Sequence, residues 1–339
     1  MRKFKIAVVG IGLVGREIIK ILKERSFPAS EIKVLATRAR TEEIGGEKYA
    51  VSATTEESFQ GIEITFFAGT EGAKGASKQF GWQAASKGTI VIDNGDDYRL
   101  DSRVPLIVPE VNAGQLRNHQ GFISSPNCAT IQLVIVLAPL HRRCRIKRVI
   151  VSSYQSVSGT GGEAVEELRS QVSAIARGEG PKKAVYPHQI AFNLFPEIGS
   201  LQNEFPGYYR EEAKTIKETR KILNEPEFAM SATCVRVPVY FGHSEAVNVE
   251  FEKRLSPEEA REILSFSPGV RVIDKPEVGL YPTPIDVVGG DDVYVGRIRD
   301  DPSSHNSLNL WIVGDNIRKG AALNTVQIAE EIIKTAVSV

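Results

Sequence analysis

The sequence contains few cysteines and no excess of either charge. Three cysteines occur in 339 residues. Such a small and uneven number makes a disulfide framework improbable, so a reducing compartment is expected. Lys plus Arg and Asp plus Glu each total 42, which gives a formal net charge of zero. A chain without a basic field is poorly suited to nucleic acid or to an anionic membrane surface. We therefore expect small-molecule substrates and neither of those partners.

Long apolar runs, internal repeats and low-complexity tracts are also lacking. The apolar stretch after the first basic residues stops at Gly10, and no cleavage site or membrane-length span follows it. A cytoplasmic location is therefore expected. With 42% hydrophobic and 25% charged residues, the chain is long enough for two domains, each with a substantial core.

Strand and helix patterns alternate in the N-terminal part of the chain. In order, strand, helix, strand, strand, helix and strand patterns cover 3–10, 13–25, 31–37, 62–69, 71–88 and 89–94. This alternation predicts an α/β fold with a Rossmann-like parallel sheet.

Longer patterns after residue 146 predict a second domain of α+β type. Strand patterns cover 148–159 and 233–251, and helical patterns cover 164–180 and 209–223. The amphipathic segment 318–337 is expected to return to the first domain. We therefore place the dinucleotide-binding domain at 1–127 with 317–339, and the second domain at 128–316.

A glycine turn joins the first strand to the first helix. The segment "VVGIGLVG" supplies Gly10, Gly12 and Gly15 in a G-x-G-x-x-G pattern. In this context glycines allow a tight turn and a close approach of backbone N–H groups to a pyrophosphate. Leu13 and Val14 would offer the amides of the first helical turn, so these five residues are candidate dinucleotide ligands.

The end of the second strand indicates which dinucleotide is bound. NAD sites tend to place an acidic residue there, on the ribose 2′-hydroxyl. Here "ATRARTEE" carries Arg38, Ala39 and Arg40, and the acids come later. Arginine suits a 2′-phosphate, so NADP is expected to be favoured over NAD.

Cys128 stands in "SPNCATIQLV", between a Pro-Asn turn and an apolar segment of helical length. A thiol in the first turn of a helix faces the positive end of the helix dipole, which favours the thiolate. The free N–H groups of that turn also suit a developing oxyanion. Cys144 and Cys234 have no such context and are interpreted as inert thiols. Cys128 is therefore the candidate nucleophile.

A thiolate nucleophile needs a proton partner, and five histidines are present. Four lie in polar, loop-like or ambiguous contexts. His243 instead follows Gly242 in a strand-rich run that also carries Arg236. Spacing alone does not decide between a catalytic and a structural histidine.

Eight segments, in order along nearly the whole chain, resemble the bacterial aspartate-β-semialdehyde dehydrogenase family. They are "VIDNGDDYRLD", "VPLIVPEVN", "SPNCATIQLV", "SSYQSVSGTGGEAVEEL", "YYREEAKTIKETRKIL", "CVRVPVYFGHSEAV", "VYVGRIRDD" and "DNIRKGAALNTVQIAEE". The resemblance implies NADPH-dependent reduction of L-aspartyl-4-phosphate to L-aspartate-4-semialdehyde and phosphate. This is a step in diaminopimelate and lysine, methionine and threonine biosynthesis. It also implies a homodimer whose second domain carries catalysis and dimerisation.

The resemblance assigns the chemistry to four residues. Cys128 would be the nucleophile that forms a thioester, and His243 the general acid/base, which as imidazolium would support the tetrahedral oxyanion. Gln155 would orient the substrate near the thiol. Asn127 would add an oxyanion donor.

The resemblance also assigns the substrate contacts. Arg236 would bind the α-carboxylate as a planar bidentate partner, for which lysine is a poor substitute. Glu211 would bind the α-ammonium, and Arg99 and Lys214 would hold the phosphate. No metal is implied.

For the cofactor, Ser158 and Gly159 would lie beside the nicotinamide, and Asn316 would contact its amide. The chain also departs from the family pattern. Its glycine turn is one residue shorter than usual and lacks a hydroxyl residue, Ala39 stands where serine is common, and Gly95 replaces another common serine. These departures predict a weaker preference for NADP than is usual in the family.

The sequence disfavours three other functions. N-acetyl-γ-glutamyl-phosphate reductases have a similar architecture, but their cysteine context is typically P-G-C-Y-P, which "SPNCATI" does not match. A noncatalytic paralogue is disfavoured because Cys128, Gln155, Arg236 and His243 are all retained. A flavin- or NAD-binding module without catalysis leaves the second domain unexplained.

Overall fold

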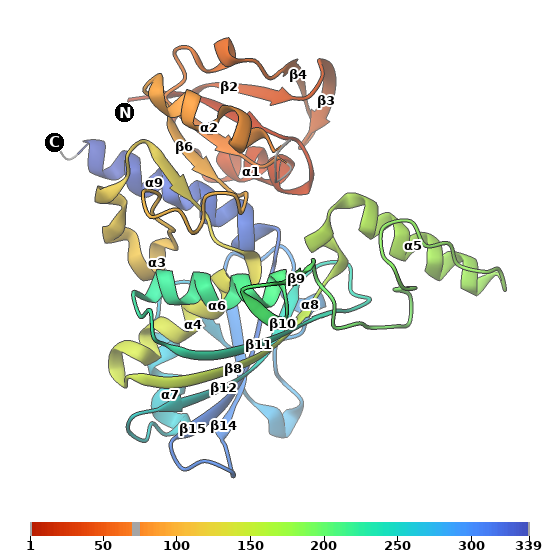
Figure 1. Ribbon diagram of the computed structural model, residues 1–339, viewed down its shortest axis with the longest axis vertical. Helices are drawn as coiled ribbons and strands as arrows, with labels where there is room; N and C mark the ends of the chain where they lie inside the picture. The colour runs from red at the N-terminus through yellow and green to blue at the C-terminus, as the bar shows by residue number, and fades with distance from the viewer. Residues whose placement is uncertain (1, 70–74, 338–339) are drawn as a thin grey trace. The chain divides into compact units, whose positions relative to one another are not determined.

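The computed structural model describes residues 2–69 and 75–337, and the chain divides into two compact units (Figure 1). The first comprises Met1–Asn127 and Ala321–Val339, and the second Cys128–Gly320. Residues 317–320, expected in the first domain, fall in the second unit. The reason is local: the Gly320 N–H donates to the carbonyl oxygen of Asp315, and Gly320 packs against Cys128.

Within the described residues, the first unit is built on a seven-stranded sheet in the order β3-β4-β2-β1-β5-β6-β7. All neighbouring strands are parallel except β3 and β4. The strands are β1 (Phe4–Val9), β2 (Ala29–Ala36), β3 (Arg40–Ile44), β4 (Glu47–Ala53), β5 (Ile64–Phe67), β6 (Ile90–Asp93) and β7 (Phe122–Ser124). The helices are α1 (Leu13–Glu24), α2 (Ala76–Ser86), α3 (Pro109–Asn112) and α9 (Leu323–Val337), with 3₁₀ turns at Glu56–Phe59 and Ala113–Asn118.

The Rossmann-like fold class expected from the sequence is confirmed. The helix expected over 71–88 corresponds to α2, and residues 71–74 of that prediction lie outside the described part of the chain. The strand expected over 31–37 begins two residues earlier, at Ala29.

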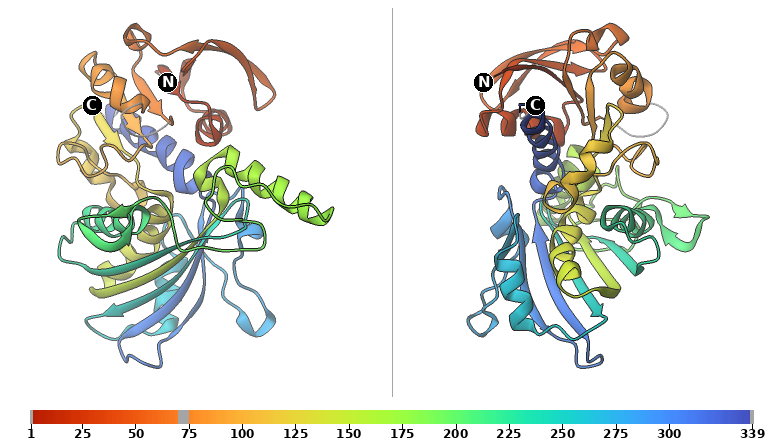
Figure 2. Two further views of the ribbon diagram at one scale, coloured as in Figure 1. Left: turned by 45° about the vertical axis from the view of Figure 1, so that its right-hand side comes forward. Right: turned by 90° about the vertical axis from the view of Figure 1, so that its left-hand side faces the viewer.

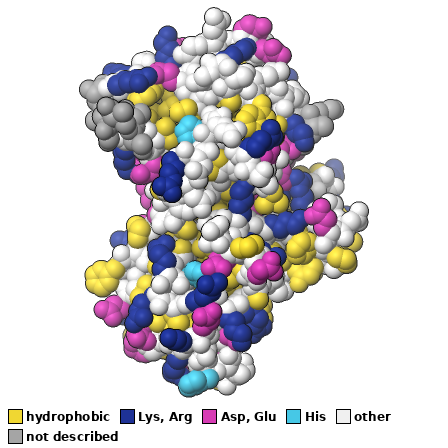
Figure 3. All heavy atoms as spheres, turned by 60° about the vertical axis from the view of Figure 1, so that its left-hand side comes forward, with side chains coloured by type: hydrophobic (Ala, Val, Ile, Leu, Met, Phe, Trp, Pro, Cys, Tyr) yellow, Lys and Arg dark blue, Asp and Glu magenta, His cyan; other side chains and the backbone are white. Residues whose placement is uncertain are grey.

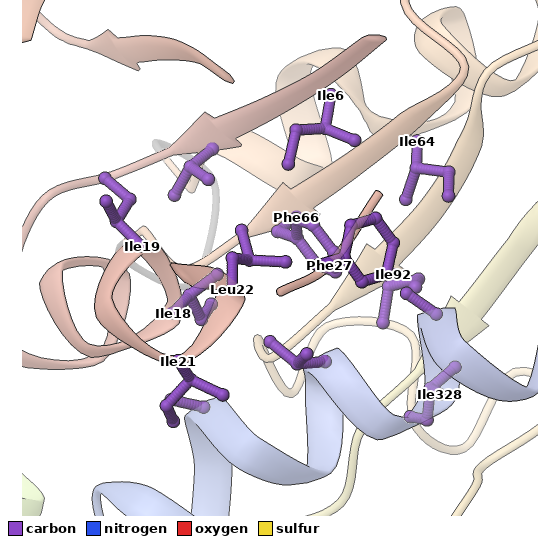
Figure 4. Close-up of a cluster of buried hydrophobic side chains, with 14 of the residues drawn as sticks. Ile6, Ile18, Ile19, Ile21, Leu22, Phe27, Ile64, Phe66, Ile92 and Ile328 are labelled. Atoms are coloured by element: carbon purple, nitrogen blue, oxygen red, sulfur yellow. The ribbon is translucent and has the colours of Figure 1, made fainter. Parts of the chain in front are cut away.

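The core of the first unit lies between the sheet and the pair α1 and α9 (Figure 4). Helix α1 is amphipathic, and its Ile18 and Leu22 are buried against Ile6 and Phe66 of the sheet. Ile328 of α9 belongs to the same cluster. Each such side chain contributes roughly 1.5 to 3 kcal/mol when fully buried. The last helix of the chain therefore completes the core of the first unit.

The hairpin β3–β4 was not foreseen from the sequence. It closes through Gly45 and Gly46, whose φ angles of +59° and +81° suit a tight hairpin turn. Along its strands Ile44 and Val51 are the buried residues, because the hairpin forms one edge of the sheet (Figure 2). With one buried residue in each strand, the two segments show almost no alternation of apolar and polar residues, so the sequence gives no recognisable strand pattern there.

The second unit is built on a mixed six-stranded sheet in the order β11-β8-β12-β15-β14-β13. Its strands are β8 (Ile146–Gln155), β11 (Ala229–Arg236), β12 (His243–Phe251), β13 (Val270–Val272), β14 (Val293–Asp300) and β15 (Ser307–Gly314), with a small separate pair β9 (Leu201–Gln202) and β10 (Phe205–Tyr209). Its helices are α4 (Cys128–Arg143), α5 (Gly162–Ala176), α6 (Arg210–Leu223), α7 (Pro257–Ser265) and α8 (Pro284–Val287). Short turns lie at Val157–Thr160, Pro276–Val278 and Arg318–Ala322, the last a π-helical turn that crosses the boundary of the two units.

The single strand pattern expected over 233–251 is two strands, β11 and β12. Pro238 and Gly242 interrupt it: proline cannot donate to a sheet ladder, and Gly242 has a φ of +86°. This break places the start of β12, and hence His243, at the end of the sheet.

Helix α4 is apolar on all sides, and every residue from Ala129 to Leu140 is buried. A helix with this pattern belongs inside a core, and α4 packs on β8, β12 and β15. Its first residue is Cys128. The fold thus places the candidate nucleophile at the N-terminus of a buried helix.

The surface carries charges of both signs. On the face shown in Figure 3, Lys and Arg side chains are interspersed with Asp and Glu. None of the described helices has the length and apolar character needed to cross a membrane. Within the same residues, no group of three or more His, Cys, Asp and Glu side chains could hold a metal ion.

Candidate active site

The glycine turn of the first unit leaves room at the N-terminus of α1. A Cβ on Gly10 would lie 2.7 Å from the oxygen of Ala68, and one on Gly15 would lie 1.8 Å from the oxygen of Gly10. Among the described residues, a Cβ on Gly12 would meet nothing within 4 Å. Within the same part of the chain no side chain caps α1 at Gly12, and the first turn of the helix holds no acid. The turn therefore combines close packing with exposed amides suited to a phosphate group.

The arginines expected at the 2′-phosphate differ in their surroundings. Arg38 and Ala39 are exposed beyond the end of β2. Arg40 donates from Nε to Glu42 at 2.6 Å, and Glu42 also pairs with Arg16. Hydrogen bonds from Arg40 and Arg16 hold the pKa of Glu42 below its usual value. The acids come after the arginines in the sequence, but the unforeseen β3 strand brings one of them, Glu42, beside Arg40.

Arg99 lies at the carboxyl ends of β6 and β7, where it is buried. Its Nε donates to the carbonyl oxygen of Ser125 at 3.0 Å, and its Nη2 to that of Asn94 at 2.6 Å. Nearby, the Gly95 N–H donates to Asp93, whose pKa burial raises to about 6. A Cβ on Gly95 would lie 3.1 Å from the Asp93 carboxyl, a tight contact.

Cys128 and His243 meet inside the second unit. The Cys128 sulfur lies 3.3 Å from His243 Nε2, since α4 begins at the cysteine and β12 at the histidine. Burial and the positive charge of Arg236 hold the pKa of His243 well below its usual value. This disfavours the imidazolium expected from the sequence, because a desolvated ring beside a guanidinium resists a second positive charge.

A hydrogen-bonded group lies behind the histidine ring. The Ser156 N–H donates to His243 Nδ1 at 3.0 Å. Asn316 Oδ1 accepts from the Gly242 N–H at 2.9 Å and from the hydroxyls of Ser156 and Ser158 at 3.1 and 3.2 Å. All three polar side chains are buried. Ser158 and Asn316, expected beside the nicotinamide, are therefore also engaged in holding the histidine segment.

Arg236 lies next to the Cys128–His243 pair. It pairs with Gln155 across β11 and β8, and its Nη1 donates to the carbonyl oxygen of Ser156 at 2.6 Å. Its buried Nε has no hydrogen-bond partner among the described residues. A Cβ on Gly159 would lie 3.2 Å from Arg236 Nη1 and 3.3 Å from His243 Nε2. A side chain at this glycine would thus crowd Arg236 and His243, and the unsatisfied Nε of the guanidinium suits a bound carboxylate.

Glu211 and Lys214 lie one turn apart on α6, with 3.8 Å between Lys214 Nζ and Glu211 Oε2. The start of this helix is fixed by Glu212, which accepts from the N–H groups of Tyr209 and Cys234. Burial raises the pKa of the Cys234 thiol, which agrees with an inert thiol. The first turn of α6 therefore presents a carboxylate and an ammonium from a well-anchored helix end.

Two polar residues near this site were missed by sequence reasoning. Ser156 gave no signal beyond its place in "YQSVSG". Glu245 is fully buried, its carboxyl oxygens have no hydrogen-bond partner among the described residues, and burial raises its pKa well above the usual value. The period-two pattern of β12 places Glu245 on the same inward face as His243, so careful strand patterning could have found it.

Comparison with known proteins gives matches over both units. Residues 5–119 match the family described as semialdehyde dehydrogenase, NAD binding domain. Residues 137–319 match semialdehyde dehydrogenase, dimerisation domain. Together the two family matches cover most of the chain.

Individual relatives match over nearly the full length. The chain is 46% identical to the aspartate-semialdehyde dehydrogenase of Aquifex aeolicus, over 98% of each chain. It is 42% identical to that of Bacillus subtilis, again over 98% of each. Among solved structures, aspartate semialdehyde dehydrogenase II of Vibrio cholerae, complexed with ASA, matches with a TM-score of 0.93 and 37% identity, over 98% of this chain and 99% of that one.

Proposed function

Because the chain belongs to the aspartate-semialdehyde dehydrogenase family, we propose that it catalyses the NADPH-dependent reduction of L-aspartyl-4-phosphate to L-aspartate-4-semialdehyde and phosphate. The reaction is reversible and would serve lysine, methionine and threonine biosynthesis. The observation that carries the proposal is the 3.3 Å separation of the Cys128 sulfur and His243 Nε2. A cysteine nucleophile and an imidazole nitrogen in hydrogen-bond contact support acyl transfer through a thioester.

The proposed cofactor is NADP, and the residues of the glycine turn fit it. Gly12 has open space around it and stands at an uncapped helix N-terminus, where a pyrophosphate would find free amides. Arg38 is proposed at the 2′-phosphate, and Ser158, Gly159 and Asn316 at the nicotinamide. When bound, NADPH supplies the hydride.

Cys128 is proposed to attack the acyl phosphate carbonyl as a thiolate, which expels phosphate and leaves a thioester on the sulfur. After reduction of the thioester, the oxyanion of the hemithioacetal needs hydrogen-bond donors. His243 Nε2 and the Asn127 amide are proposed for this role. Collapse to the aldehyde returns the thiolate, which the helix N-terminus favours.

The substrate is proposed to lie with its α-carboxylate on Arg236 and its α-ammonium on Glu211. The unsatisfied Nε of Arg236 supports the first contact, since a buried guanidinium N–H without a partner costs free energy until an anion satisfies it. Gln155, opposite Arg236 in the sheet, would orient the reacting carbonyl. Arg99 and Lys214 are proposed to hold the phosphate.

The protein is proposed to form a homodimer through the second unit. Support comes from the family match to a dimerisation domain and from large apolar side chains exposed on this unit. Phe192, Val278 and Ile285 are 74, 72 and 87% exposed. We expect light scattering to give twice the mass of one chain, and a monomer would contradict this assignment.

The decisive experiment is an assay of aspartate semialdehyde oxidation with phosphate present or omitted, and with NADP or NAD. We expect reduction of NADP that depends strictly on phosphate, since phosphate must attack the thioester to release product. N-acetylglutamate semialdehyde serves as the control substrate. Equal or faster turnover of that substrate, or oxidation without phosphate, would contradict the proposed reaction.

A further inference from the structure

Ser156 faces the nitrogen of His243 that does not face Cys128. The Ser156 N–H donates to Nδ1 at 3.0 Å, whereas Nε2 lies 3.3 Å from the Cys128 sulfur. An imidazole nitrogen that accepts a hydrogen bond from an amide carries a lone pair and no proton. The single proton of the neutral ring must then be on Nε2, between the ring and the sulfur.

The Ser156 side chain ties this amide to the backbone that carries the ring. Its hydroxyl donates to Asn316 Oδ1 at 3.1 Å, and its oxygen also lies 3.0 Å from His243 Nδ1 itself. Asn316 Oδ1 accepts in addition from the Gly242 N–H at 2.9 Å. Gly242 immediately precedes His243. The Gly242 N–H also fixes the orientation of the Asn316 amide, because only its oxygen can accept. The buried amide side chain of Asn316 thus fixes the position of Ser156 relative to the backbone that carries His243.

The peptide groups of residue 156 also connect the histidine to the substrate-binding arginine. The Ser156 carbonyl oxygen accepts from Arg236 Nη1 at 2.6 Å, while its N–H serves His243. Arg236 therefore lies close enough to oppose a positive charge on the ring, in a position where burial already opposes it. Both effects favour a neutral imidazole.

We propose that Ser156 is a positioning residue that holds His243 as a neutral imidazole protonated on Nε2, so that His243 donates a hydrogen bond to the Cys128 sulfur. The inference rests on the proposed roles of Cys128 and His243. It reverses the usual direction of such a pair, because a ring with its proton on Nε2 cannot accept the thiol proton. That proton leaves to solvent instead, which the partly exposed Cys128 can reach. The sulfur is held as an acceptor before substrate arrives, and the Nε2 proton remains available for the oxyanion formed later.

The tautomer can be read directly in the full-length protein. Labelling with ¹⁵N-histidine and a long-range ¹H–¹⁵N correlation spectrum separate the three ring states, and His243→Asn identifies the signals among five histidines. At pH 7 we expect a neutral ring with the proton on Nε2. A proton on Nδ1, or on both nitrogens, would overturn the proposal.

Variants of Ser156 test the positioning role. Ser156→Ala keeps the backbone N–H but removes the hydroxyl, and with it both the link to Asn316 and the direct contact with Nδ1. We expect kcat to fall three- to tenfold with KM within twofold, and Nδ1–H signals to join the Nε2–H signals. Ser156→Thr retains the hydroxyl and should restore both. The matched control is Ser307→Ala, a buried serine at the opposite end of the β12–β15 pair, where its hydroxyl bonds to Ser304. Wild-type behaviour of Ser156→Ala, or an equal loss in Ser307→Ala, would contradict the proposal.

One further measurement separates this inference from the proposed function. The rate at which iodoacetamide alkylates Cys128, followed by mass spectrometry of the peptide, needs neither substrate nor cofactor. We expect it to fall in Ser156→Ala by about the factor seen in kcat and to be unchanged in Ser307→Ala. If aspartate semialdehyde were not a substrate, the ring signals and the alkylation rate would still decide the tautomer. An alkylation rate unaffected by Ser156→Ala would overturn the positioning role.

Discussion

The Cys128–His243 pair of the second unit and the Arg38–Arg40 edge of the first both present polar groups for a proposed ligand, but in opposite settings. His243 is fully buried, and both of its nitrogens have assigned neighbours, the Ser156 amide and the Cys128 sulfur. At the edge, Arg38 is exposed and Arg40 is engaged with Glu42.

The two settings differ in how strongly each polar contact can act on a bound ligand. In the buried pair, low local dielectric and fixed hydrogen bonds make each polar contact strong and its loss costly. At the exposed edge, solvent screens the charges and an internal carboxylate competes for them. Substitutions in the first region should therefore act on chemistry and substrate binding by large factors, and substitutions in the second should shift coenzyme preference by small ones.

The largest effect is expected for Cys128→Ser. A serine hydroxyl is rarely ionised at neutral pH and leaves poorly from the intermediate, so activity should fall more than about a hundredfold. Folding and cofactor binding should remain near normal. Cys144→Ser is the matched control and should have almost no effect on activity. Cys144 lies away from His243, and its thiol donates a hydrogen bond to the Lys253 carbonyl oxygen. Residual activity above a hundredth, measured by cofactor absorbance, would rule out nucleophilic catalysis by Cys128.

Arg236→Lys should weaken substrate binding next most strongly. An ammonium cannot reproduce the planar fork of a guanidinium, and hydrogen bonds to charged groups contribute roughly 1.5 to 3 kcal/mol. The apparent KM for aspartate semialdehyde should therefore rise about ten- to a hundredfold, with a smaller change in kcat. An unchanged KM would remove Arg236 from the substrate site.

Glu245→Gln tests the buried region through the pH dependence of the free energy of unfolding. Because burial raises the pKa of Glu245 in the folded state, the unfolded chain ionises at lower pH than the folded protein. The wild-type contribution of this residue to stability therefore falls as pH rises above its unfolded pKa, by up to about 1.4 kcal/mol per pH unit. The variant lacks this slope.

Urea unfolding of both proteins at pH 5, 6, 7 and 8 measures the effect. The free energy of unfolding of Glu245→Gln should improve relative to wild type with each step upward in pH. A constant offset between the two proteins across the series would mean that Glu245 is ionised in the folded state.

The smallest effect is expected at the exposed edge. Replacing Arg38 and Arg40 together by alanine should raise the apparent Kd for NADP roughly two- to fivefold, since exposed charge pairs are weak, and hardly change that for NAD. Glu42→Gln should lower the apparent Kd for NADP, because it releases Arg40 and Arg16 from a competing carboxylate.

Titration of each variant with both coenzymes measures these effects, and NAD, which lacks the 2′-phosphate, provides the internal control. Equal losses for NADP and NAD would assign the arginines to folding or to the shared pyrophosphate.

The sequence was sufficient wherever a local pattern sets the structure. The glycine turn lies between β1 and α1 as expected, and Cys128 is the first residue of α4. Periodicity and turn residues act over a few positions and can therefore be recognised without knowing the fold. The hairpin β3–β4 escaped because its outward-facing residues are polar on both sides of the turn.

Contacts between distant segments could not be read in the same way. The Ser156 hydroxyl and Asn316 are 160 positions apart, and neither carries a local signal of the bond between them. The surroundings of the His243 ring are set by that contact and by the amide of Ser156. The family resemblance therefore pointed to His243, but only tertiary structure shows which of its nitrogens faces the Ser156 amide and which faces the Cys128 sulfur.

The return of α9 to the first unit has a consequence for synthesis of the chain. Ile328 and Val326 belong to the core formed by β1, β5 and α1, and they are translated after the entire second unit. During translation the first unit lacks α9, so the face of its sheet that α1 and α9 share is covered by α1 alone, while the second unit can already fold. The order of folding on the ribosome is therefore expected to invert the order of the sequence, and a chain that stops before residue 321 should leave the ribosome with a folded second unit and an unfinished first one.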